Sequence, residues 1–138
     1  MNERDMDRMV DLFVSAAERC YEAGFDAVEI HMGHGYLLNQ FLSPLDNNRQ
    51  DEYGGSAENR ARFPARVLTA VKQAVGDRMA VIAKINVADG RSRGAQLEDG
   101  LVTAKILEAA GADMLVLSGG RNVESGWFTF GSNLNLEA

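Results

Sequence analysis

The sequence has few of the residues that build disulfide frameworks and metal sites. Its 138 residues include one cysteine, Cys20, and two histidines, His31 and His34. A single cysteine cannot form an internal disulfide, and Cys20 falls on the apolar side of a helical pattern, where cysteine usually acts as a small buried hydrophobe. Two histidines spaced H-x-x-H, without a further histidine or cysteine cluster, supply too few ligands for a typical zinc site. We therefore expect no metal site and no reactive thiol.

Long apolar runs and clustered basic charge are also missing. No stretch reaches the roughly eighteen apolar residues that a membrane helix needs, and the start, MNERDMDRM, is charged where a signal peptide has an apolar segment. Fourteen basic residues against twenty acidic ones give a net charge of -6, and no basic cluster could neutralise a run of phosphates. We expect a cytoplasmic protein that binds neither membranes nor nucleic acid.

Hydrophobic periodicity predicts alternating helices and strands. Apolar residues spaced three and four apart predict a first helix over 2–23, which Asn2 can cap, and QLEDGLVTAKILEAA predicts another over 96–110. A helical region between them starts at Ser56 and stops at Gly76, and we expect Pro64 to kink it or to split it in two. A loop is predicted over 33–55. Short β-branched or aliphatic runs predict strands over 25–31, 79–86 and 113–119.

Strands that alternate with helices predict an α/β fold with a parallel sheet, built from three repeated units. Two of the joins are alike, EAGFDAVEI at 22–30 and AAGADMLVL at 109–117. Such units occur in open doubly wound sheets and in closed (β/α) barrels. No glycine-rich phosphate loop follows a strand, so the pattern leaves both architectures open.

Alternation along the strands separates an aliphatic face from a polar one. The aliphatic face contains Val28, Ile30, Val81, Ala83 and Ile85, as packing against helices requires. The opposite face becomes more polar toward the C-terminal end of each strand. It includes Glu29, His31, Lys84, Asn86 and Ser118. In (β/α) barrels this end carries the chemistry.

The segment EIHMGHGYLLNQFLSP, residues 29–44, gathers both histidines and Tyr36 where the first strand ends. Neutral imidazoles can donate a hydrogen bond to an oxygen or move a proton near neutral pH. The alternative is structural, with His31 as a satisfied histidine at a strand end, His34 as a loop residue and Tyr36 as a packing residue. The residues alone do not decide between these interpretations.

A longer segment, EIHMGHGYLLNQFLSPLDNNRQDEYGGSAENRARF, resembles the signature region of the old yellow enzyme family of FMN-dependent NAD(P)H oxidoreductases. The shared features are the paired histidines, Gly-Tyr-Leu-Leu, Gln-Phe-Leu, Asn-x-Arg-x-Asp-x-Tyr-Gly-Gly-Ser and Glu-Asn-Arg. AGFDAVEIH and VIAKIN lie where that family has successive barrel strands. The resemblance implies a (β/α)8 TIM barrel with FMN at its C-terminal mouth and NAD(P)H as reductant.

The same resemblance implies roles for four residues. His31 and His34 resemble the pair that donates hydrogen bonds to the carbonyl oxygen of an α,β-unsaturated substrate or to the oxygen of a phenol. Tyr36 resembles the general acid that protonates the carbon next to that carbonyl. Lys84 occupies the position where much of the family has an arginine beside the flavin pyrimidine, and it keeps the charge but loses the bidentate fork. The implied activity is reduction of the C=C bond of a small enone.

A complete barrel needs about 250 residues, so the resemblance implies that residues 1–138 form part of a single FMN-binding domain. They would supply three βα units, corresponding to family strands four to six. We expect the isolated chain to be inactive, because most flavin contacts would come from the missing strands. The alternative is a noncatalytic piece that self-associates through its unpaired edges, giving a homo-oligomer. A relative with an iron–sulfur cluster would need its cysteines outside this segment.

Overall fold

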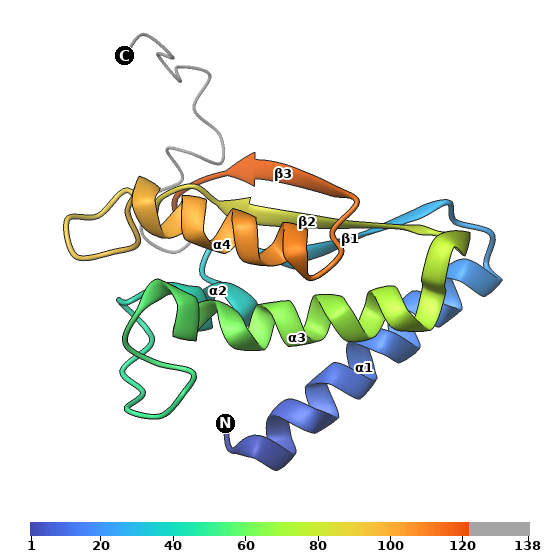
Figure 1. Ribbon diagram of the computed structural model, residues 1–138, viewed down its shortest axis with the longest axis horizontal. Helices are drawn as coiled ribbons and strands as arrows, with labels where there is room; N and C mark the ends of the chain where they lie inside the picture. Colours follow the sequence, from blue (N-terminus) through green and yellow to red (C-terminus); the bar gives the residue numbers. More distant parts are fainter. Residues whose placement is uncertain (122–138) are drawn as a thin grey trace, which may run out of the picture.

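The computed structural model describes residues 1–121, which alternate between helices and parallel strands (Figure 1). The segment 122–138 lies outside the described residues. The elements in chain order are α1 (Glu3–Glu22), β1 (Ala27–Met32), α2 (Leu37–Leu42), α3 (Ala57–Val75), the 3₁₀ turn η1 (Gly76–Arg78), β2 (Ala80–Asn86), α4 (Leu97–Ala109) and β3 (Met114–Ser118).

The three strands form one parallel sheet in the order β1-β2-β3. The register places His31 beside Lys84 and Lys84 beside Val116, while Asn86 pairs with Ser118. Partners across a parallel ladder point to the same side of the sheet. The polar residues predicted to share one face of the strands therefore do share it. The other side of the central strand is almost completely buried, with Val81, Ala83 and Ile85 at most 1% exposed.

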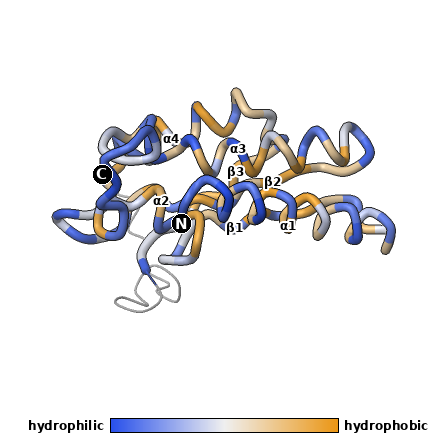
Figure 2. The backbone as a smooth tube through the Cα atoms, turned by 90° about the horizontal axis from the view of Figure 1, so that it is seen from below, coloured by the Kyte–Doolittle hydropathy of each residue, from blue (hydrophilic) through white to orange (hydrophobic). Residues whose placement is uncertain are grey.

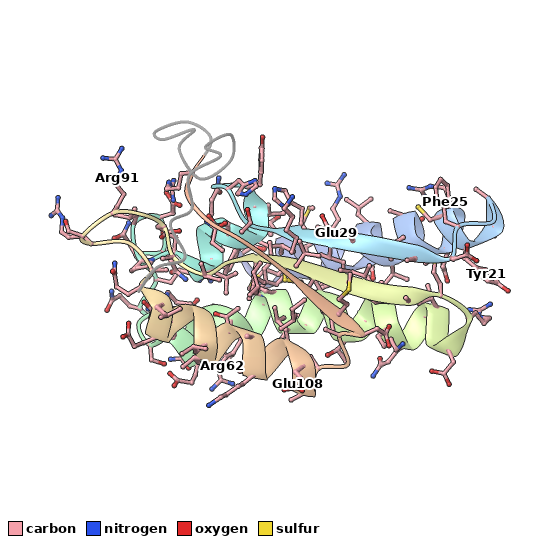
Figure 3. All side chains as sticks on the ribbon, turned by 90° about the horizontal axis from the view of Figure 1, so that it is seen from above. Tyr21, Phe25, Glu29, Arg62, Arg91 and Glu108 are labelled. Atoms are coloured by element: carbon pink, nitrogen blue, oxygen red, sulfur yellow. The ribbon has the colours of Figure 1, made fainter. Side chains whose placement is uncertain are left out.

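The long helices pack on the aliphatic side of the sheet (Figure 1). In Figure 2 the hydrophobic colour is concentrated where the strands and α3 meet, and in Figure 3 Glu29 projects from β1 on the side away from α3 and α4. The core is therefore a single layer between sheet and helices, and the polar side of the sheet is left open. Among residues 1–121, no helix is both long and apolar enough to cross a membrane.

Pro64 does not split the second predicted helix in two. It lies inside α3, which runs without interruption from Ala57 to Val75. An internal proline costs a helix about 3 kcal/mol. Here both sides of the proline are anchored in the core, because Phe63 and Val67 are fully buried. Gly76 ends the helix as predicted, with φ 59°.

The predicted loop over 33–55 contains a short helix that the sequence analysis missed. α2 occupies Leu37–Leu42 and buries Leu38, Asn39, Phe41 and Leu42. Three of these are apolar and spaced three and four apart, which was a helical signal within a segment otherwise rich in glycine and polar residues. The prediction of a continuous loop was therefore wrong for these six residues.

Arg60 ties the loop after α2 to the helices beneath it. Its guanidinium donates to the carbonyl oxygen of Leu42 at 2.7 Å, to that of Gly55, and to Asp99 of α4 at 2.7 Å. Arg60 is 6% exposed, whereas Gly55 and Asp99 are in partial contact with solvent. Arg49 pairs separately with Asp51, and Arg62 donates to the side chain of Asn59.

Arg60→Met should lower the free energy of unfolding by about 3 kcal/mol, because it leaves the carbonyls of Leu42 and Gly55 and the Asp99 carboxylate without their buried cation. Urea unfolding of the two proteins measures the difference. Arg62→Met is the matched control, since Arg62 is exposed on the same helix and should change stability little. Equal losses in the two variants would contradict the role assigned to Arg60.

Candidate functional site

The C-terminal end of β1 brings the two histidines and Tyr36 into one cluster. The ring centroids of His31 and His34 lie 4.9 Å apart in an edge arrangement, and those of His31 and Tyr36 lie 5.2 Å apart. Tyr36 is half exposed at the N-cap of α2. The spatial gathering predicted for these three side chains is therefore present. Lys84 lies beside His31 in the sheet register, on the same open face.

Local backbone geometry explains how such a short segment aims three side chains. His34 has φ 61° and Gly35 φ 83°, so the chain reverses sharply directly after the strand. The Gly35 N–H donates to the Asn39 side chain at 2.7 Å and the Tyr36 N–H to the Gly33 carbonyl at 3.3 Å, which fixes the turn. A non-glycine residue in the left-handed region is uncommon and often marks a functional position.

Both imidazoles are held neutral near pH 7. Burial lowers the pKa of His31, and the positive charge of Lys84 lowers it further against the opposing effect of Glu29. Burial also lowers the pKa of His34, assisted by His31 and Lys84. Neutral imidazoles each carry one N–H donor and one acceptor nitrogen. The cluster can therefore donate hydrogen bonds to a neutral or developing anionic oxygen.

These lowered pKa values predict that the free energy of unfolding falls as the pH drops below the ordinary histidine value of 6.5. The unfolded chain then takes up protons that the folded chain binds only at lower pH. Urea unfolding at several pH values between about 7.5 and 5 measures the slope. The double variant His31→Gln, His34→Gln should flatten it, and an unchanged slope would contradict the prediction.

One buried nitrogen of the cluster has no partner in the described part of the chain. This atom is His31 Nδ1, and buried polar atoms without a hydrogen bond are rare in folded proteins. Such an atom can be satisfied by a polar group from outside residues 1–121. With the cationic Lys84 beside it on the open face, the donor set suits an anionic or oxygen-rich group such as a flavin or a carbonyl substrate.

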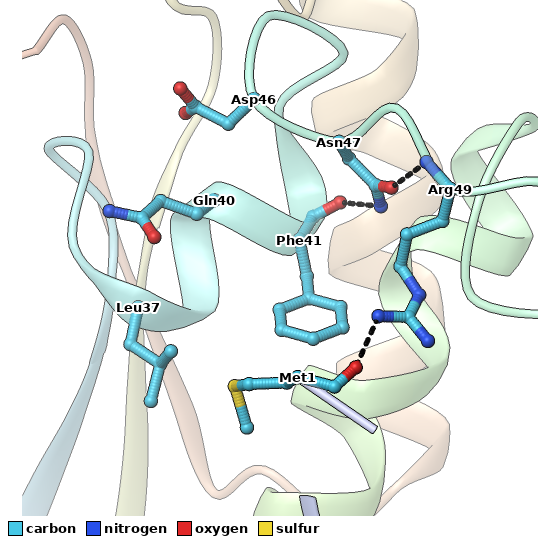
Figure 4. Close-up of a pocket in the computed structure, with 7 residues that line it drawn as sticks. All are labelled: Met1, Leu37, Gln40, Phe41, Asp46, Asn47 and Arg49. Atoms are coloured by element: carbon cyan, nitrogen blue, oxygen red, sulfur yellow. Dashed lines mark hydrogen bonds between the residues drawn. The ribbon is translucent and has the colours of Figure 1, made fainter. Parts of the chain in front are cut away.

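The pocket shown in Figure 4 is a different feature. It has a volume of about 340 Å³ and lies beside α2. Asn47 donates to the Phe41 carbonyl at 2.7 Å, and Arg49 to the Met1 carbonyl at 2.8 Å, across its wall. None of the four predicted site residues lines it. The candidate site is instead the open polar face of the sheet.

Two residues at this face acquire contacts that sequence reasoning did not assign. Asn86 Oδ1 accepts from the His34 N–H at 3.2 Å, and Ser118 Oγ lies 2.6 Å from His34 Nε2. Strand alternation had placed both residues on the polar face, but it did not indicate that they contact His34. Among the described residues no group of three or more histidine, cysteine or acidic side chains could hold a metal ion.

The chain is similar in sequence to curated reductases and dehydrogenases. The chain is 44% identical over 133 residues to the 4,4'-dithiodibutanoate disulfide reductase of Rhodococcus erythropolis, covering 96% of this chain and 33% of that protein. It is 40% identical over 125 residues to the NADPH dehydrogenase of Bacillus subtilis, covering 91% of this chain and 36% of the relative. The chain thus spans about a third of the length of these relatives.

Solved structures of flavoenzymes share the fold. A 2-naphthoyl-CoA reductase superposes with a TM-score of 0.84 and 32% identity, over 88% of this chain and 19% of that one. Histamine dehydrogenase from Rhizobium sp. 4-9 superposes with a TM-score of 0.79 and 33% identity, over 87% of this chain and 18% of that one. Both are TIM-barrel enzymes, so the three-stranded sheet is a partial (β/α)8 barrel, as predicted. A profile of the NADH:flavin oxidoreductase / NADH oxidase family matches residues 1–125, and the chain belongs to this family, which includes the old yellow enzymes.

Proposed function

We propose that this chain forms the substrate-binding part of an FMN-dependent NAD(P)H oxidoreductase that reduces the C=C bond of α,β-unsaturated carbonyl compounds. The observation that carries the proposal is the clustering of His31, His34 and Tyr36 at the C-terminal end of a barrel strand. The ring centroid of His31 lies 4.9 Å from that of His34 and 5.2 Å from that of Tyr36. Family membership supports flavin and nicotinamide chemistry.

Each residue of the cluster has a distinct task in this reaction. FMN, when bound, supplies a hydride to the alkene carbon farther from the carbonyl group. His31 and His34 donate hydrogen bonds to the carbonyl oxygen, where negative charge develops, and preorganised donors stabilise that charge. The Tyr36 hydroxyl delivers a proton to the carbon next to the carbonyl. Lys84 is the residue that would contact the flavin, and its ammonium group supplies a fixed cation.

A chimera tests the proposal with the relatives at hand. The matching third of the Bacillus subtilis NADPH dehydrogenase is replaced by residues 1–125 of this chain. The complete barrel should bind FMN and oxidise NADPH faster when a cyclic enone is added. Titration of the 138-residue chain alone with FMN should show no binding, since it provides three strands of a barrel. An FMN-loaded chimera that reduces no enone would refute the proposal.

A noncatalytic, self-associating role is the second candidate, and the edges of the sheet favour it. Within residues 1–121, β1 and β3 each pair on one side only. Leu117 on β3 is 65% exposed and Phe25 before β1 is 60% exposed. Unpaired edges with apolar side chains promote pairing between chains. This role requires two results. The purified chain should sediment as an oligomer, and the FMN-loaded chimera should reduce no enone.

A further inference from the structure

His34 is held in place by the ends of two other strands. Its backbone adopts the left-handed conformation, φ 61°, and its N–H donates to Asn86 Oδ1 at 3.2 Å. Its ring nitrogen Nε2 lies 2.6 Å from the hydroxyl oxygen of Ser118. Asn86 and Ser118 are direct partners in the β2–β3 register, so neighbouring strands fix the backbone and the ring of one residue.

Asn86 is itself anchored in a buried network. Its amide nitrogen donates to the Gly120 carbonyl at 2.8 Å and to Asp89 Oδ1 at 3.3 Å. The other oxygen of Asp89, a fully buried residue, accepts from Ser43 Oγ at 2.6 Å and from the Ala95 N–H at 2.8 Å. This network joins the ends of β1, β2, β3 and α2, and fully satisfied buried networks are rigid.

Glycine at position 33 makes room for the arrangement. A Cβ atom there would lie 2.7 Å from Asn86 Oδ1, closer than real Cβ contacts come. The atom that would be displaced is the acceptor of the His34 N–H. The sequence Gly33-His34 therefore permits the approach of the Asn86 side chain that sets the His34 backbone.

The contact with Ser118 leaves a single ring nitrogen for a ligand. In residues 1–121, the Ser118 hydroxyl is the one hydrogen-bond partner of the His34 ring, and it engages Nε2. The ring is neutral near pH 7, because burial lowers the pKa of His34. A neutral imidazole can donate through Nδ1 only when Nε2 is the acceptor nitrogen. A serine hydroxyl can supply the proton that Nε2 accepts.

We infer that Ser118 is a positioning residue whose hydroxyl donates to His34 Nε2 and so keeps the imidazole proton on Nδ1, facing the substrate oxygen, while Asn86 fixes the backbone beneath it. The inference rests on the proposed function, because the need for a donor toward that oxygen is what assigns the proton to Nδ1. The tautomer itself can be measured in this chain without a substrate. This arrangement makes Ser118 a determinant of whether His34 donates or accepts toward the ligand.

Nitrogen NMR of the histidine rings tests the assignment directly. The chain has two histidines, so ¹⁵N-histidine labelling with a His31→Gln spectrum for assignment resolves the His34 nitrogens. Measured at pH 7.5 on the 138-residue chain and on the chimeric barrel, His34 should show a protonated Nδ1 and an unprotonated Nε2. Ser118→Ala should move the two shifts toward each other, and Ser118→Thr should restore them.

Ser92→Ala is the control, since Ser92 is exposed in the loop after β2 and should leave both shifts unchanged. In the chimera, Ser118→Ala should also weaken phenol binding by about tenfold, the effect of one hydrogen bond. A protonated Nε2 in the unmodified protein, or shifts that Ser118→Ala does not move, would overturn the inference. A protonated Nδ1 in a barrel that reduces no enone would refute the proposed function and support the tautomer assignment.

Discussion

Replacing Tyr36 with phenylalanine in a complete barrel that carries this segment should slow enone reduction by roughly 10²- to 10⁴-fold, the usual contribution of a general acid. The rate at which NADPH reduces the holoenzyme should stay nearly unchanged. The substitution removes the hydroxyl and keeps the ring, whose centroid lies 5.2 Å from that of His31. Packing is therefore retained while the proton donor is lost.

Rapid mixing separates the two steps for this variant. The reduced holoenzyme is mixed with a cyclic enone in one experiment, and the oxidised holoenzyme with NADPH in the other. Tyr53→Phe is the matched control, because the Tyr53 hydroxyl contacts Glu3 of α1 at 3.3 Å, away from the cluster, and neither rate should change. Equal losses in both steps for Tyr36→Phe would show that the residue is not the proton donor.

The sequence was sufficient for the parts of the fold that depend on local patterns. Strand alternation placed His31, Lys84, Asn86 and Ser118 on one face, and the parallel register confirms it. Successive side chains of a strand alternate between its two faces, and this alternation does not depend on what packs around the sheet. The choice between an open sheet and a barrel was not accessible from the same patterns, since both use the same βα unit.

Tertiary packing decided the points that local preference left open. Pro64 has an intrinsic cost in a helix, yet Phe63 and Val67 on either side are fully buried, and α3 is not split in two. The contact between Ser118 and His34 joins residues 84 positions apart, and no local signal specifies such a pair. The candidate site was thus predictable as a set of residue types on one edge, and its hydrogen bonds were not.

Replacing His34 with alanine should reduce the rate of enone reduction by about 10²- to 10³-fold, the cost of one lost donor at a developing oxyanion. Phenol binding should weaken as well, because a bound phenol oxygen uses the same donor. Alanine loses the imidazole together with its Ser118 contact, but it keeps the backbone N–H that donates to Asn86 Oδ1. Steady-state enone reduction and phenol titration of the chimera measure both losses.

Asparagine at position 34 is the informative comparison. Its side-chain amide provides a donor, and asparagine tolerates the left-handed backbone, φ 61°, better than most residues. His34→Asn should therefore keep most of the activity that His34→Ala loses. If both variants fail equally while FMN stays bound, the imidazole acts through its shape or its proton affinity. If both remain active, the oxygen of the substrate is held by His31 alone, and the two-donor arrangement proposed for this site is wrong.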